Sequence, residues 1–89
     1  MEAFEVLVNG VRVCTVGVPH NGVASVIVSH FSPGSDDRYM LRAGGLDVTT
    51  REYIHWDFPP LSFGDEITIR LVDTESVDDP AHRQPAFDG

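Results

Sequence analysis

The stretch NGVASVIVSHF, residues 21–31, decides the fold of this chain. Five of its side chains recur at the i, i+3, i+4, i+7 and i+8 spacing of a helix that packs one face against a sheet: Val23, Val26, Ile27, His30 and Phe31. Asn21 is a good helix N-cap, and the Pro-Gly pair at 33–34 supplies a stop. The stretch also holds four Val and Ile residues, which favour a strand because β-branched side chains are stiff at χ1. We expect a short helix over 22–31, with a strand as the alternative.

A β-hairpin is predicted before this stretch. The Asn-Gly pair at 9–10 separates two β-branched runs, 4–8 and 11–16. Asn-Gly favours a type I′ turn, because both central residues of that turn need positive φ. A regular two-residue hairpin pairs Glu5 with Cys14 and alternates the two faces. On the face away from the core we expect three residues of this hairpin: Leu7, Arg12 and Cys14.

Three further strands are expected, over 38–43, 53–58 and 66–72. The first should end at the Gly-Gly pair 44–45, and the second at two prolines that cannot donate to a ladder. The last strand alternates cleanly, so its apolar residues should face the core: Ile67, Ile69 and Leu71. Its other face should present Thr68, Arg70 and Val72.

Composition indicates one small domain of 89 residues, with 42% hydrophobic and 22% charged residues. Its last part, 73–89, carries five of the fourteen carboxylates and few large apolar side chains. Such a segment buries too little surface to offset its ordering entropy. We therefore expect a folded domain over 1–72 and a mobile acidic tail over 73–89.

The expected order of elements resembles the β-grasp fold. The segment LSFGDEITI, 61–69, is similar to the last turn and strand of ubiquitin-like sulfur carriers from thiamin and molybdopterin biosynthesis, and VLVNGVRV, 6–13, is similar to their first hairpin. The resemblance implies an α+β fold with a mixed sheet and one short helix. It also implies a C-terminal glycine that a partner enzyme activates or conjugates. That glycine would be Gly89, although Asp88 stands where the family has a second glycine. If 22–31 is a strand, the alternative is an all-β barrel or sandwich.

The sequence offers little support for an enzyme. Cys14 is the only cysteine, and the charge of Glu5, its expected neighbour, would raise the pKa of the thiol. The four histidines lack the spacing of metal ligands, and no Gly-rich phosphate loop precedes a helix. His55 and Asp57 share the outward face of one expected strand and could form a small polar recognition site. We predict no catalytic residue, no metal site and no cofactor.

The expected function is that of a non-enzymatic protein-binding domain. Apolar residues framed by arginine on the open sheet face form the expected docking patch: Leu7, Arg12, Cys14, Thr68, Arg70 and Val72. The ubiquitin-like version engages or conjugates a partner through Gly89. The alternative is a small acidic inhibitor, an immunity protein or antitoxin, of a basic partner. A net charge of -8 disfavours nucleic acid and anionic membranes as partners, and the absence of an apolar run of about 18 residues predicts a cytoplasmic protein.

Overall fold

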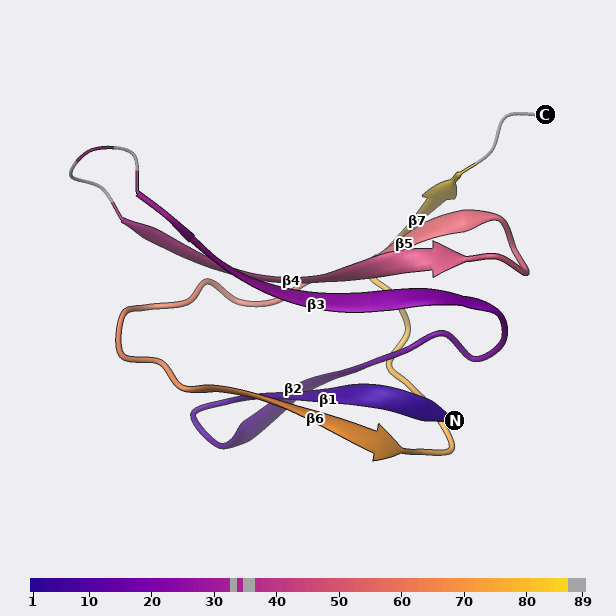
Figure 1. Ribbon diagram of the computed structural model, residues 1–89, viewed down its shortest axis with the longest axis horizontal. Helices are drawn as coiled ribbons and strands as arrows, with labels where there is room; N and C mark the ends of the chain where they lie inside the picture. The colour runs from indigo at the N-terminus through magenta and orange to yellow at the C-terminus, as the bar shows by residue number, and fades with distance from the viewer. Residues whose placement is uncertain (33, 35–36, 87–89) are drawn as a thin grey trace.

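The computed structural model describes residues 1–32, 34 and 37–86, which form two layers of antiparallel strands (Figure 1). The strands are β1 Glu2–Val8, β2 Val11–Val16, β3 Gly22–Phe31, β4 Arg38–Asp47, β5 Glu52–Trp56, β6 Ile67–Asp73 and β7 His82–Pro85. Sheet A has the order β2-β1-β6, and sheet B has the order β3-β4-β5-β7. None of the described residues lies in a helix, so this part of the chain has no helix that could cross a membrane.

Residues 22–31 are a strand, and the predicted helix is wrong. All ten residues of β3 pair with β4, from Gly22 opposite Asp47 to Phe31 opposite Arg38. Ten ladder positions and four β-branched residues outweigh the cap and the apolar spacing that favoured a helix. The α+β β-grasp prediction is therefore also wrong. The protein is all-β, and its two sheets form an open sandwich rather than a closed barrel.

The first hairpin forms at the predicted turn, with φ of 53° at Asn9 and 79° at Gly10. The strands start in the expected register and then shift at a bulge between Val6 and Leu7, so that Cys14 lies opposite Val6 instead of Glu5. A bulge adds one residue to one strand and reverses the alternation beyond it. Cys14 therefore faces the core, which corrects the expected outward orientation.

Strand β4 does not end at the Gly-Gly pair. It continues through Gly44 and Gly45 to Asp47 and pairs with strands on both sides. A Cβ atom on Gly45 would overlap the carbonyl oxygen of Val23 in β3. Glycine is thus required here for close approach of two backbones, rather than as a strand terminator.

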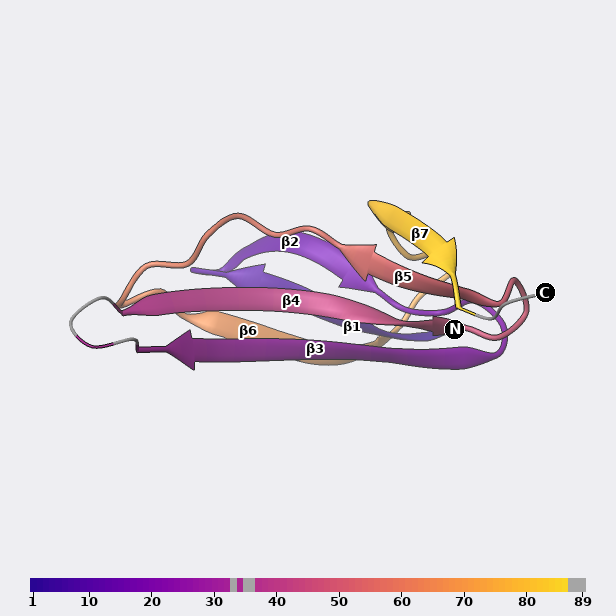
Figure 2. The same ribbon diagram turned by 90° about the horizontal axis from the view of Figure 1, so that it is seen from above.

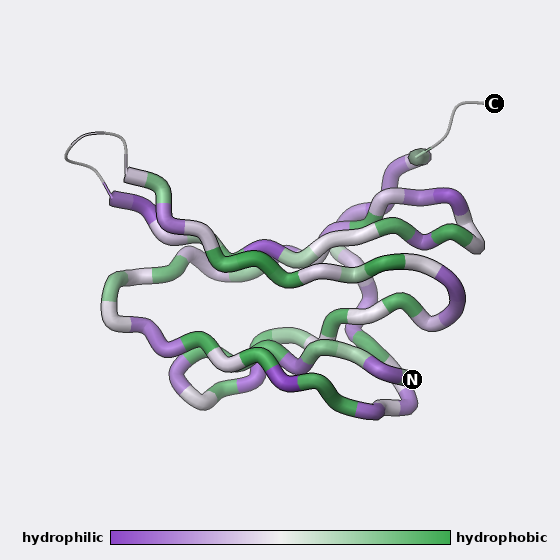
Figure 3. The backbone as a smooth tube through the Cα atoms, in the orientation of Figure 1, coloured by the Kyte–Doolittle hydropathy of each residue, from purple (hydrophilic) through white to green (hydrophobic). Residues whose placement is uncertain are grey.

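The core lies between the sheets and draws on both. Its buried cluster consists of Val6, Cys14 and Val16 from sheet A and Leu41, Ala43, Ile54 and Trp56 from sheet B. Apolar stretches run along strands of both layers (Figure 3). The shared cluster is what holds the two sheets together, because burial of apolar surface is the main stabilising term.

Residues beyond the expected domain boundary at 72 take part in the fold. Strand β6 runs to Asp73, and β7 adds a fourth strand to sheet B by pairing with β5. Arg83 of β7 lies 3.3 Å from Glu52 and 3.7 Å from the buried Asp47. Most of the segment predicted to be a mobile tail therefore lies against the sandwich. Residues 87–89 lie outside the described residues.

Candidate functional site

The residues of the predicted docking patch are only partly brought together. Leu7 lies opposite Thr68, and Arg70 lies opposite Glu5, on the outer face of sheet A. Leu7 is nevertheless buried, and Arg70 pairs with the Glu5 carboxylate at 3.5 Å. The remaining members are the half-buried Val72, the core residue Cys14 and Arg12, which binds Asp78. Gly89 lies outside the described residues.

Cys14 is a packing residue with an unreactive thiol. Burial and, after it, the nearby Asp78 carboxylate together raise its pKa from 9.0 to about 11. The rise agrees in direction with the sequence argument, but the carboxylate is Asp78 and not Glu5. Because the thiolate is the nucleophilic form, this environment opposes covalent catalysis.

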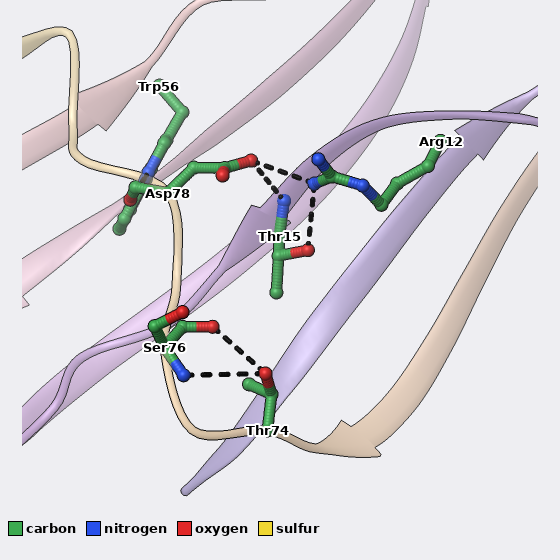
Figure 4. Close-up of polar contacts among 6 residues, drawn as sticks. All are labelled: Arg12, Thr15, Trp56, Thr74, Ser76 and Asp78. Atoms are coloured by element: carbon green, nitrogen blue, oxygen red, sulfur yellow. Dashed lines mark hydrogen bonds and ion pairs between the residues drawn. The ribbon is translucent and has the colours of Figure 1, made fainter.

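One side of the sandwich is covered by residues 74–81, which we call the strap. The strap leaves β6, passes the free edge of β2 and crosses to sheet B (Figure 1). Its Asp78 N–H donates to the Thr15 carbonyl at 2.9 Å. The Asp78 carboxylate accepts hydrogen bonds from Thr15 N–H at 2.9 Å and from Arg12 at 3.0 Å (Figure 4). The buried Trp56 indole donates to the Asp78 carbonyl at 2.8 Å, so this one residue links both sheets.

The opposite side of the sandwich is open. Strands β3 and β6 are each one of the two edge strands of their sheet, and they lie on the same side of the molecule (Figure 2). Within the described residues, each pairs with a single neighbour, β4 or β1. Their second backbone edges therefore face outward, and an unpaired edge is a template for another strand. We call this surface the open side.

Large apolar residues are exposed along the open side. On β6 they are Ile69, 42% exposed, and Leu71, 81% exposed. Both face inward as predicted, because they lie opposite core-facing residues of β1, yet sheet B does not cover them. The exposed apolar residues of β3 are Val23, Ile27, Val28 and Phe31. Exposed apolar side chains on neighbouring edge strands are a feature of interaction surfaces.

A shallow groove continues from the open side onto the outer face of sheet B. It has a volume of about 430 Å³, and its floor is formed by backbone because Gly44 and Gly45 carry no side chains. Its apolar walls are Val23, Ile27, Leu46 and Tyr53. The groove thus adds side-chain contact area beside the β3 edge.

A polar cluster lies at the other end of sheet B. His82 Nε2 is 3.1 Å from the Asp57 carboxylate, and His55 lies opposite His82 across the β5/β7 ladder. These residues line a cavity of about 560 Å³ together with Tyr39, Trp56 and Phe58. His82 and Asp57 are exposed, so water competes for their pairing. Among the described residues, no group of three or more His, Cys, Asp or Glu side chains is placed to hold a metal ion.

The apolar edge does not follow from the predicted elements, because 22–31 was expected to be a helix and 66–72 a covered strand. A usable signal was present, since residues 22–31 contain no Asp, Glu, Lys or Arg. An exposed helix normally carries charged residues on its outer face.

No family model matches the chain, and no curated protein and no solved structure matches it. The fold and the site therefore define the class of protein, an all-β two-sheet sandwich with one side covered by a strap and one side open.

Proposed function

We propose that this protein is a non-enzymatic protein-binding module whose binding site is the open side. One observation carries the proposal: two edge strands, β3 and β6, lie on the same side of the molecule (Figure 2) and carry exposed apolar side chains. An exposed sheet edge binds an extended segment by strand addition, in which backbone hydrogen bonds supply affinity and alternate side chains supply specificity. The expected partner is a protein segment with apolar residues at every second position.

Charge favours a partner that also carries basic residues. The arginines Arg12, Arg70 and Arg83 are paired with carboxylates of the same chain. The protein as a whole has a net charge of -8, which would steer a basic segment toward it and speed association. Because β3 itself has no Asp or Glu side chain that could pair with them, we expect the basic residues of the segment on either side of the apolar positions that contact β3.

The non-enzymatic part of the proposal is supported by the chemistry of the nucleophile and the bases. Cys14 is buried with a raised pKa, and the His82–Asp57 pair is exposed to water. We place the protein in the cytoplasm, where the free thiol of Cys14 would stay reduced. Conjugation through Gly89 is not part of this proposal.

The test uses a random dodecapeptide library displayed for selection against the full chain. Selected peptides should show alternating apolar residues, and NMR titration with the synthetic peptides should shift amides of β3 and β6. Amides of β2 and β5 serve as the internal control, because the strap is bonded to the β2 edge and β5 is paired with a strand on each side. The proposal is overturned if the selected peptides shift only the amide resonances of the control strands. It is also overturned if neither peptides nor proteins bind at the open side.

A further inference from the structure

The edge of β3 lacks every device that normally prevents pairing with another strand. Protein sheets protect their edges with charged side chains, proline or bulges. Residues 22–31 include no Asp, Glu, Lys or Arg and no proline, and the β3–β4 ladder is continuous over all ten positions. We infer that β3 pairs antiparallel with β3 of a second copy, with Ile27 of one copy opposite Ile27 of the other. The inference rests on the proposed function, because it uses the same β3 edge, and it names a second copy of this chain, instead of a basic segment, as the occupant of that edge.

The side chains of β3 match one another in this register. On the outer face, Val23 lies opposite Phe31, Ser25 lies opposite Ser29, and Ile27 lies opposite itself. Apolar residues thus meet apolar residues and hydroxyls meet hydroxyls, which are favourable cross-strand pairs. Moving the axis by one residue in either direction puts Ile27 opposite Ser25 or Ser29. The sequence of β3 therefore selects one register.

The same geometry covers the exposed residues of β6. Neighbouring antiparallel strands are related by a two-fold axis normal to the sheet, so sheet A of both copies lies on the same side of the joined sheet B. Because β3 and β6 lie on one side of the molecule (Figure 2), pairing of the β3 strands brings the two β6 strands toward each other. Ile69 and Leu71 would then pack against their counterparts instead of water.

Charge does not oppose contact at this edge. Each copy carries a net charge of -8, and directly opposed like charges destabilise a strand pair. In the proposed register no Asp, Glu, Lys or Arg of β3 lies opposite another, because the strand has none. Repulsion between copies therefore comes only from more distant, solvent-screened residues.

Cysteine cross-linking tests the register on the full chain. In the Ile27→Cys variant the two thiols would lie opposite each other, at a Cα separation compatible with a disulfide. Val11→Cys is the matched control, since Val11 is 65% exposed against 53% for Ile27 and lies on β2. With oxidised glutathione as electron acceptor, Ile27→Cys should form a disulfide dimer at least about tenfold faster than Val11→Cys. An equimolar mixture of Val23→Cys and Phe31→Cys should yield the mixed disulfide in preference to either symmetric one.

Sedimentation equilibrium tests the dimer without cross-linking. Wild-type protein and Val11→Lys should be dimers at micromolar concentration. Ile27→Lys opposes two ammonium groups on the axis and should raise the dissociation constant about 100-fold or more, while an unchanged circular dichroism spectrum shows that it is folded. A wild-type monomer at every concentration, or equal cross-linking at Ile27 and Val11, overturns the inference. If the wild-type protein is a monomer that still binds the selected peptides at β3, the proposed function stands and only the dimer is overturned. If it neither dimerises nor binds peptides at the open side, the dimer and the proposed function are both overturned.

Discussion

Cys14 places a titratable thiol among the core residues between the two sheets. Desolvation, followed by the Asp78 carboxylate, raises its pKa from 9.0 to about 11. At pH 8 this change lowers the thiolate fraction about 100-fold. We expect an aromatic disulfide reagent to label Cys14 of the native protein at least about 100-fold more slowly than the urea-unfolded chain. Similar labelling rates in the two states would contradict the burial of Cys14.

Asp78 contributes stability that depends on pH. Its backbone hydrogen bond from Thr15, and then its bond to Arg12, hold the pKa of the carboxyl below its ordinary value of 3.8. The side chain is 45% exposed, so we expect Asp78→Ala to lower the free energy of unfolding by only about 1 kcal/mol at pH 7. A lowered pKa means that this contribution is present above 3.8 and is lost as the pH falls through the folded-state pKa.

Urea unfolding at pH 7 and at pH 3 measures this difference. The difference in the free energy of unfolding between wild type and Asp78→Ala should be smaller at pH 3 than at pH 7. The exposed neighbour Asp79 provides the control, because Asp79→Ala leaves the Thr15 and Arg12 contacts in place. A gap that is the same at both pH values would mean that the carboxylate charge contributes nothing.

A few contacts hold the strap against the two sheets. Substitution of Trp56 tests how much the strap contributes to stability. Trp56 is 4% exposed, and its indole N–H donates to the Asp78 carbonyl at 2.8 Å. Trp56→Phe removes the donor and leaves a gap beside the core. We expect the free energy of unfolding to fall by about 2–4 kcal/mol. Tyr53→Phe, on the exposed face of the same strand, should cost much less.

Amide hydrogen exchange separates a bound strap from a mobile tail. The Asp78 N–H should be protected in the native protein, since it donates to Thr15 of β2. Trp56→Phe should speed its exchange more than that of amides in β1. If the Asp78 amide hydrogen exchanged at the rate of a free peptide, the result would support a mobile tail instead of a bound strap.

How far sequence reasoning could reach differs from element to element. The hairpin turn at Asn9-Gly10 and the alternation of β6 are predictable because each depends on local backbone and side-chain geometry. The strand state of 22–31 is not, because its apolar spacing fits both periods and its ladder with β4 is a tertiary contact. The exposure of Leu71 is also out of reach, since it depends on how far the other sheet extends.

At the scale of the whole molecule, the two sides of the sandwich differ in what covers them. The strap is bonded to the β2 edge and covers Trp56, whereas among the described residues β3 and β6 each pair with one neighbouring strand and carry exposed apolar side chains. The docking surface that we propose is therefore the open side and not the outer face of sheet A, where Leu7 is buried and Arg70 is paired with Glu5. The site follows from the absence of cover rather than from any cluster of reactive groups.

The net charge of -8 makes the salt dependence of binding diagnostic. Two copies repel each other at long range but meet through an uncharged strand, so screening should strengthen their association. We expect the dimer dissociation constant to fall several-fold when sodium chloride is raised from about 20 mM to about 500 mM, as the Debye length shortens to a few ångströms. A basic partner held by charge complementarity, as an acidic inhibitor would bind it, must respond in the opposite direction. Sedimentation equilibrium across this salt range measures the sign. Weakening of self-association by salt would show that the copies are held by ion pairs and would contradict pairing through β3, which has no Asp, Glu, Lys or Arg.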